Sequence, residues 1–325
     1  MSMKILWLRP STGENVSVRR ELIAEKLRKR GFEVDIQDSS GLDAVSAIWL
    51  AINGEYDIIA GNVRMGLFVG YPLAKVFGKP FLGDVSDTIS DIEDLPYPLL
   101  RLLVAYEWFV LKRASATVFV YESSYREAIQ RGVKSPVKLP NAVDYELFSS
   151  PDPAVIKTSK RILEKTGVNL QKPVAIYIGV FTDNYHIVDI LKAAEKNPDW
   201  EFVFVGEGEL EGSVSQASEK QQNVCYPGSF EYHLIPGFLS HADAGFCFKD
   251  AEQPLKLKEY GAAGVPAIVQ PGELGKFYSD DELIFCKPEA TAISEVLTKI
   301  LNGELSQTTE NLRERMEQHS WDAIV

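Results

Sequence analysis

Residues 254–266 read Pro-Leu-Lys-Leu-Lys-Glu-Tyr-Gly-Ala-Ala-Gly-Val-Pro, and this stretch says most about the fold. Proline is well suited to the first turn of a helix, and glycine commonly follows the last helical residue. The stretch therefore predicts a helix that begins at Pro254 and stops at Gly264. An apolar run at 266–269 follows at once, so the sequence predicts a helix leading directly into a strand.

The preceding residues repeat this pairing of strands and helices. Apolar and β-branched runs occupy 174–178, 202–205 and 244–248, and each is separated from the next by a helix-length or loop segment. Alternating strands and helices are typical of a parallel sheet that is covered by helices on both faces. Ligands of such sheets bind beyond the carboxyl ends of the strands.

The first half of the chain shows the same alternation. Strand-like runs lie at 4–8, 32–36, 56–60 and 80–83, and a helical apolar pattern from Val18 is closed by Gly31. The Ser-Ser-Pro-Asp-Pro stretch at 149–153 interrupts the pattern. We therefore expect an α/β protein of two doubly wound domains, 1–148 and 149–308, and a final helix at 309–325 that could cross back to the first domain.

Composition narrows the class of protein. The 325 residues carry a formal net charge of −12, which disfavours a nucleic-acid-binding protein because such binding relies on basic patches. The three cysteines are widely spaced and form no C-x-x-C pair, and no apolar stretch approaches the ~20 residues of a spanning helix. We expect a soluble protein of the cytoplasm.

Two further segments, both earlier in the chain than residues 254–266, carry recognisable motifs. Residues 139–144 read Leu-Pro-Asn-Ala-Val-Asp and are followed by Phe148, and residues 204–208 read Phe-Val-Gly-Glu-Gly. In this order, the three segments resemble the signatures of retaining-type family 4 glycosyltransferases and related GT-B enzymes that assemble polysaccharides and glycolipids. Weaker similarity, for example Ser-Trp-Asp at 320–322, extends the resemblance over nearly the whole chain.

The resemblance implies a GT-B fold, in which two Rossmann-like domains face an interdomain cleft. It implies a hexosyltransferase-type enzyme that moves a sugar from a nucleotide diphosphate sugar to a glycan, lipid-linked or small-molecule acceptor, with retention favoured. No cofactor or metal is implied beyond that donor. The implied donor-binding residues are Gly179, Gly206, Glu207, Lys256, Leu257 and Glu259, and Lys256 is also a catalytic candidate.

The chemistry of residues 254–266 agrees with this role. Phosphate oxygens are favoured at a helix N-terminus by its unpaired amides and its dipole, and Lys256 and Lys258 could add positive charge there. Glu259 offers a carboxylate for two vicinal hydroxyls, and in the family this position binds the ribose. The competing interpretation of all three side chains is an ordinary solvated helix face.

Two departures from the family pattern keep other functions open. Many relatives have a glutamate eight positions before Glu259, where this chain has Ala251 with Glu252 beside it. Many also have an arginine and a lysine after the first strand of the donor domain, but residues 179–186 contain neither. Lys256 is the expected substitute. The alternatives are a nucleotide-sugar binding protein without transferase activity, or another GT-B enzyme such as a nucleotide-sugar epimerase.

The acceptor is expected in the first domain. Gly13, Glu14 and Asn15 follow the first strand and form either an acceptor-binding loop or an ordinary polar turn. Asp84 and Asp87 follow the strand at 80–83 and are catalytic candidates. One of them could act as a general base in an inverting reaction or cap a helix, whereas in a retaining reaction the leaving phosphate would accept the proton.

Residues 98–113 are almost continuously apolar and end in Lys-Arg. The sequence favours a buried helix, and the alternative is peripheral contact with the inner face of a membrane, where a lipid-linked acceptor would be met. The four histidines show no metal-ligand spacing, and we expect no metal site.

Overall fold

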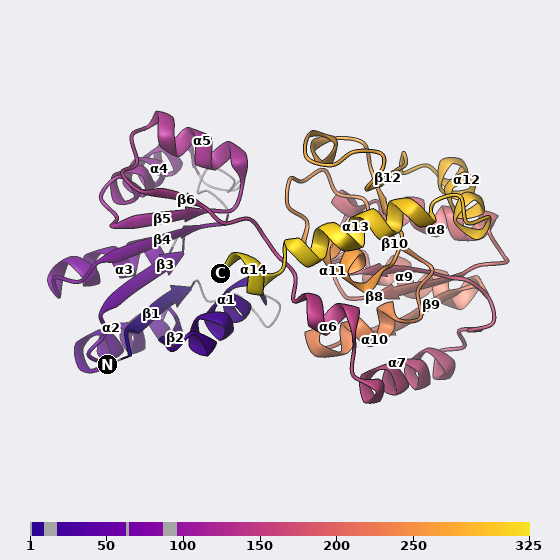
Figure 1. Ribbon diagram of the computed structural model, residues 1–325, viewed down its shortest axis with the longest axis horizontal. Coiled ribbons are helices and arrows are strands. Elements are labelled where there is room, and N and C mark those ends of the chain that lie inside the picture. Colours follow the sequence, from indigo (N-terminus) through magenta and orange to yellow (C-terminus); the bar gives the residue numbers. More distant parts are fainter. Residues whose placement is uncertain (1, 10–17, 63–64, 87–95) are drawn as a thin grey trace. The chain divides into compact units, whose positions relative to one another are not determined.

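A computed structural model describes residues 2–9, 18–62, 65–86 and 96–325 of the chain. The chain divides into two compact units (Figure 1). Unit 1 consists of residues 1–141 with Val325, and unit 2 consists of residues 142–324. This division precedes the boundary that the sequence predicts after Phe148. The Phe148 side chain is buried in the hydrophobic core of unit 2, which explains the difference.

Unit 1 is built on a six-stranded parallel sheet in the order β2-β1-β3-β4-β5-β6. Its strands are β1 (Lys4–Arg9), β2 (Glu33–Asp38), β3 (Ile58–Asn62), β4 (Phe81–Val85), β5 (Ala116–Phe119) and β6 (Pro136–Lys138). The helices of its described part are α1 (Val18–Lys29), α2 (Asp43–Asn53), α3 (Met65–Val76), α4 (Tyr97–Leu111) and α5 (Glu122–Gln130).

Unit 2 contains a second six-stranded parallel sheet in the order β12-β11-β10-β7-β8-β9. Its strands are β7 (Val174–Ile178), β8 (Glu201–Val205), β9 (Val224–Gly228), β10 (Ala244–Cys247), β11 (Ala267–Val269) and β12 (Ile284–Phe285). Its α-helices are α6 (Tyr145–Ser149), α7 (Pro153–Lys165), α8 (Ile187–Lys196), α9 (Glu211–Lys220), α10 (Ile235–Leu239), α11 (Leu255–Ala263), α12 (Ala290–Leu301), α13 (Ser306–Gln318) and α14 (Trp321–Ile324). The short 3-10 helices are η2 (Asp183–Tyr185), η3 (Tyr232–Leu234) and η4 (Glu273–Lys276).

The continuous apolar runs of the sequence reflect burial of both sheet faces. Along β7, Ile176 and Ile178 belong to one hydrophobic cluster, whereas Ala175 and Tyr177 belong to another. Since successive strand residues point to opposite faces, each face packs against its own layer of helices. Every strand predicted from the sequence is present, whereas β5, β6, β9 and β12 were not among the predicted strands.

The order of strands in unit 2 fixes where a ligand can bind. From β7 the chain continues to β8 on one side, and it returns later to form β10 on the other side. The helices that follow these two strands cover opposite faces of the sheet, so a crevice opens between the carboxyl ends of β7 and β10. In unit 1 the equivalent point lies between β1 and β3.

The 139–144 motif belongs to both units. The Arg19 guanidinium of α1 donates to the carbonyl oxygens of Leu139 and Pro140 at 2.9 and 3.0 Å. Val143 then forms a parallel bridge with Ser320, and the Trp321 amide donates to the Val143 carbonyl at 3.0 Å. The motif therefore follows the last strand of the first sheet and contains the start of the second unit.

Helix α4 corresponds to the apolar stretch at 98–113 and is only partly buried. Trp108, Val110 and Leu111 pack into the core of unit 1, whereas Tyr97 and Leu102 are 69% and 67% exposed. The prediction of a buried helix is therefore correct for its last two turns alone. Among the described helices, none is long and apolar enough to cross a membrane.

Candidate functional site

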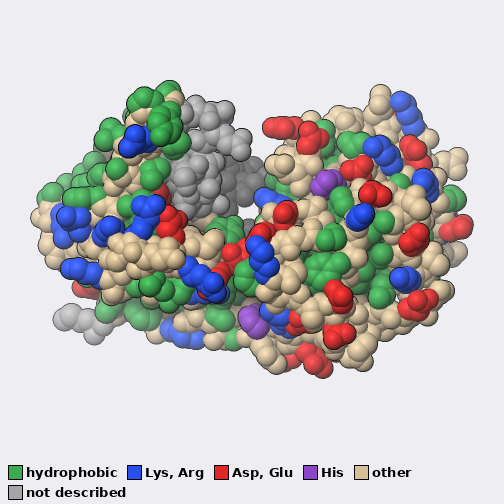
Figure 2. Space-filling view, turned by 90° about the horizontal axis from the view of Figure 1, so that it is seen from above, with side chains coloured by type: hydrophobic (Ala, Val, Ile, Leu, Met, Phe, Trp, Pro, Cys, Tyr) green, Lys and Arg blue, Asp and Glu red, His purple; other side chains and the backbone are tan. Residues whose placement is uncertain are grey.

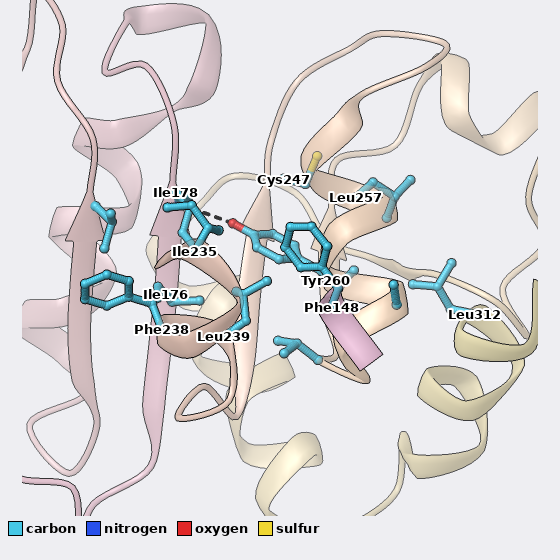
Figure 3. Packing of buried hydrophobic residues seen from close by; sticks show 14 of the residues in the cluster. Phe148, Ile176, Ile178, Ile235, Phe238, Leu239, Cys247, Leu257, Tyr260 and Leu312 are labelled. Carbon is cyan, nitrogen blue, oxygen red and sulfur yellow. Dashed lines mark hydrogen bonds between the residues drawn. The ribbon is translucent and has the colours of Figure 1, made fainter. Parts of the chain in front are cut away.

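The strands β7 and β10 separate at their carboxyl ends. They pair through Ala175 and Ile176 only, and beyond this point the hydroxyl of Tyr260 spans the gap. The Ile178 amide donates to this hydroxyl at 3.2 Å (Figure 3). The hydroxyl in turn donates to the Phe246 carbonyl at 3.3 Å. Tyr260 thus satisfies two backbone groups that the sheet leaves open, and it holds α11 beside the crevice.

Helix α11 begins at Leu255, one residue later than its sequence predicts, and ends before Gly264 as predicted. Pro254 precedes its first residue in an extended conformation, with no side chain capping the helix. Gly264 ends it in the left-handed conformation with φ of 70°, which glycine adopts without steric cost. Because the first amides of a helix have no partner within it, the N-terminus of α11 offers hydrogen-bond donors at the crevice.

Lys256 lies on the first turn of α11 between two aromatic rings. Its Nζ lies 4.0 Å from the ring centroid of Tyr177 and 4.0 Å from that of Tyr185. This nitrogen is buried and has no hydrogen-bond partner in the described part of the chain. Burial lowers the pKa of Lys256 to about 8. The chain thus holds an ammonium group at the crevice whose hydrogen bonds are unused.

Glu259 follows one turn later and is 6% exposed. Burial raises the pKa of its carboxyl to about 7, against the opposing effects of the Tyr232 hydroxyl and the Lys256 ammonium. Within the described residues, no hydrogen bond of ordinary geometry reaches the buried Tyr232 hydroxyl. Lys256 and Glu259 are three positions apart, so both project from the same side of the helix. The site therefore combines a cation with a buried carboxylate that can accept hydrogen bonds from hydroxyl groups.

The glycines at the strand ends allow close approach. Gly179 follows β7, and a Cβ there would stand 3.0 Å from Nζ of Lys256. Gly206 follows β8, and a Cβ there would stand 1.9 Å from the carbonyl oxygen of Gly179. Both have positive φ values, 132° and 145°. Glycine is therefore required at Gly206 by packing, and at Gly179 it keeps space beside the ammonium group.

The other residues predicted to bind the donor, Glu207 and Leu257, have different surroundings from Lys256 and Glu259. Glu207 is exposed and accepts a hydrogen bond from the Ser229 hydroxyl at 3.3 Å. The Leu257 side chain is buried in the hydrophobic core, so only its backbone could meet a ligand. Lys258 is also buried, and burial together with the nearby Arg315 lowers its pKa to about 8. The same arginine lies on α13, which packs against α11, so Lys258 points away from the crevice.

Sequence reasoning missed one cation of the site. Lys249 lies two residues after the end of β10, and its Nζ donates to the Tyr185 hydroxyl at 3.3 Å. Its position immediately after the predicted strand at 244–248 was the available signal. Glu252, which stands beside the position of the family's earlier glutamate, is 9% exposed.

In unit 1, Asp84 is the last but one residue of β4, which extends past the predicted strand end at 83, and it lies beside Asn62 in the sheet register. Asp84 is 4% exposed, and its carboxylate lies 3.4 Å from Nε of Arg20. The other predicted residues of this side, Asp87, Gly13, Glu14 and Asn15, lie outside the described residues. Where the structure describes the chain, no group of three or more His, Cys, Asp or Glu side chains could hold a metal ion.

Comparison with known proteins matches this architecture. The family model for glycosyl transferases group 1 matches residues 158–320. The teichuronic acid biosynthesis glycosyltransferase TuaH of Bacillus subtilis (strain 168) is 26% identical over 182 residues, which are 52% of this chain and 43% of TuaH. The chain thus matches less than half of the length of that relative.

Solved structures resemble the chain over both units. HepE of Anabaena, in complex with UDP-glucose, superposes with a TM-score of 0.75 at 18% identity, covering 99% of this chain and 97% of HepE. Sucrose-phosphate synthase of Thermosynechococcus elongatus gives a TM-score of 0.74 at 16% identity, covering 99% and 96%. The similarity confirms the predicted GT-B fold.

Proposed function

Since the chain belongs to the glycosyl transferases group 1 family of glycosyltransferases, we propose that it transfers a sugar from a nucleotide diphosphate sugar bound by unit 2. The observation that carries this proposal is the placement of Lys256 and Glu259 on one side of α11, beside the crevice between β7 and β10. A cation and a carboxylate that lie close together suit a ligand in which a diphosphate is joined to a ribose, because the cation can meet the phosphates and the carboxylate can accept from the ribose hydroxyls. The UDP-glucose held by HepE supports a donor of this class.

Within this function, each residue has a defined task. Glu259 accepts hydrogen bonds from the ribose hydroxyls, and Lys256 balances the charge that develops on the diphosphate as it leaves. Gly179 leaves room for the phosphates beside Lys256, and Gly206 lets its backbone lie close to that of Gly179 at the edge of the same site. Glu207 and the Leu257 amide complete the donor contacts that the resemblance implies. No metal or other cofactor is part of the proposal.

We propose transfer with retention of configuration. The bond between the sugar C1 and the diphosphate oxygen breaks, and the acceptor oxygen bonds to C1 on the same face. The acceptor proton passes to an oxygen of the leaving phosphate. Asp84 is buried against Arg20, which suits a positioning carboxylate better than a base presented to the acceptor. Asp87 and the loop of Gly13, Glu14 and Asn15 stay predictions for the acceptor side.

The acceptor is proposed to be a glycan or a lipid-linked sugar, with a small molecule as the remaining class. TuaH is named for teichuronic acid biosynthesis, which supports a role in polysaccharide assembly. Helix α4 supports a site at a membrane surface, because Tyr97, Leu102 and Phe109 are exposed apolar side chains on it. The guanidinium groups of Arg101 and Arg113 lie over the rings of Tyr97 and Phe109. Figure 2 shows hydrophobic side chains on the surface of unit 1, with Lys and Arg among them.

The first test is calorimetric titration of the chain with UDP-, ADP- and GDP-sugars, repeated with Glu259→Ala. We expect one donor class to bind the wild type and to lose at least tenfold in affinity in the variant, because a charge-assisted hydrogen bond is worth about 1.5–3 kcal/mol. Slow hydrolysis of the bound donor would distinguish a transferase from a protein that only binds nucleotide sugars. Absence of binding by every member of the panel would contradict the proposal.

A further inference from the structure

A second lysine reaches the same aromatic ring as Lys256. Nζ of Lys249 lies 5.0 Å from the ring centroid of Tyr185 and donates to its hydroxyl at 3.3 Å. Nζ of Lys256 lies 4.0 Å from the centroid of the same ring. One phenol therefore stands in contact with two ammonium groups, which come from the loop after β10 and from the first turn of α11.

The charges at this point are unbalanced. Two ammonium groups near one ring repel each other, and burial of Lys256 increases the repulsion because the surroundings screen it poorly. Glu259 is the carboxylate that acts on Lys256 electrostatically, and it lies one helical turn away. An anion bound between the two lysines would remove the repulsion and supply the hydrogen-bond acceptor that the Lys256 ammonium lacks.

The backbone holds Lys249 in place. Its amide donates to the Cys247 carbonyl at 3.0 Å, and its own carbonyl accepts from the Ala251 amide at 3.0 Å. The next residue, Asp250, accepts a hydrogen bond from the Glu273 amide at 2.7 Å, which ties the loop to η4. Lys249 therefore lies on a turn after β10 whose backbone is held by hydrogen bonds. Its side chain is only half-buried, so a ligand can reach it.

We propose that Lys249 and Lys256, with Tyr185 between them, form a two-cation site for the diphosphate of the donor. Lys249 then supplies the second positive charge that residues 179–186, which contain no arginine or lysine, do not provide. It does so from the opposite side of the crevice, from β10 instead of β7. This inference rests on the proposed donor function and adds a residue to its phosphate contacts.

The competing explanation is that Lys249 only fixes the position of Tyr185. The two explanations differ in what the phenol hydroxyl does. If Lys249 acts through its contact with that hydroxyl, Tyr185→Phe should weaken nucleotide binding as much as removal of the lysine. If Lys249 contacts phosphate, Tyr185→Phe should have a small effect, because the ring beside both ammonium groups is retained.

The experiment uses calorimetric titration of the full chain with UDP, ADP and GDP and with the matching monophosphates. For the diphosphate that binds the wild type, we expect Lys249→Met to weaken binding by about tenfold to a hundredfold, and binding of the monophosphate by less. Lys249→Arg should restore most of the affinity, and the salt dependence of binding should become shallower in Lys249→Met. Lys220→Met, which changes an exposed lysine on α9, is the control for charge alone.

Each outcome decides the inference. Unchanged diphosphate binding by Lys249→Met, or an equal loss in Tyr185→Phe, overturns it while the donor function stands. If no nucleotide binds the wild type, the donor function fails and this inference fails with it. Thermal unfolding of each variant checks folding, and Lys249→Gln replaces Lys249→Met if that variant unfolds at a lower temperature than Lys220→Met.

Discussion

The ring of Tyr260 lies so close to the backbone of Gly245 that a Cβ on residue 245 would stand 2.8 Å from its Cδ2 atom. This contact lets the ring pass beneath β10, and from there its hydroxyl reaches the gap between Ile178 and Phe246. A glycine inside a strand normally weakens it. Here the missing side chain allows α11 to pack against the sheet and opens the crevice.

Gly245→Ala should therefore destabilise unit 2. The added methyl group meets a ring that is fully buried and cannot move aside, and overpacking of this kind costs about 1–3 kcal/mol. Urea unfolding measures the change. Gly212→Ala in α9 is the matched control, because nothing lies within 4 Å of its added Cβ, and it should be neutral or stabilise by up to about 1 kcal/mol. Equal effects of the two variants would contradict the packing argument.

Tyr260→Phe should destabilise unit 2 through its two backbone partners. The Ile178 amide and the Phe246 carbonyl would remain buried without a hydrogen bond, at a cost of about 1–3 kcal/mol in the free energy of unfolding. Tyr278→Phe is the control, because Tyr278 is also buried. If both variants unfold at the same urea concentration, the hydroxyl of Tyr260 has no bridging role.

Glu259 should make stability depend on pH. Its pKa is raised from the ordinary value of 4.5 to about 7 in the folded chain, so between these values the folded state binds more protons than the unfolded state. The stabilisation is complete below pH 4.5 and is lost as pH rises through 7. The free energy of unfolding of the wild type, relative to Glu259→Gln, should fall by about 3 kcal/mol over this range. A difference that stays constant with pH would disprove the assignment.

Lys256→Met should stabilise the nucleotide-free chain while it weakens nucleotide binding. Its pKa is lowered from 10.5 to about 8, so at pH 7 the buried charge opposes folding by up to about 3 kcal/mol. Loss of the ring contacts reduces the gain to about 1–2 kcal/mol. Lys258→Met is the control, since its pKa is also lowered to about 8 by burial. Thermal unfolding should show both variants stabilised, and titration should show that only Lys256→Met loses nucleotide affinity.

Leu102→Glu should reduce binding to vesicles that contain anionic lipid. Leu102 is 67% exposed on α4, and a carboxylate there both removes apolar contact and repels the surface. Ile52→Glu on α2, at a site that is 58% exposed, should leave co-sedimentation with the vesicles unchanged. An equal loss of vesicle binding in both variants would mean that the membrane contacts a wider surface than α4. Absence of vesicle binding by the wild type would contradict the membrane proposal.

Regular features of the sequence predicted the fold well. Strands that are buried on both faces leave uninterrupted apolar runs, as at β7 and β8, and Pro254 and Gly264 mark the two ends of α11 through backbone geometry alone. The sequence did not predict β9 and β12, for a physical reason. β12 has two residues, and β9 includes Pro227 and a register shift, so neither shows a clear period.

The placement of Lys256 and Glu259 on one side of a helix was predictable, because their spacing of three positions and the flanking Pro254 and Gly264 are local features of the sequence. The contribution of Tyr185, Tyr232 and Lys249 depends on long-range packing, and a single sequence gives no indication of which loop side chains will share one crevice. The burial of Lys258 illustrates the same limit, because its sequence neighbours predict a solvated face as readily as contact with α13.

The pairing of Val143 with Ser320 closes unit 2 into a segment whose two ends meet. A segment of this kind can be exchanged between related genes as one block, because its two ends leave the folded unit at the same place. Exchange of residues 142–324 among relatives would therefore keep the second sheet, its helices and its hydrophobic core together. Such an exchange would replace α11 and its surroundings while the first sheet stayed unaltered.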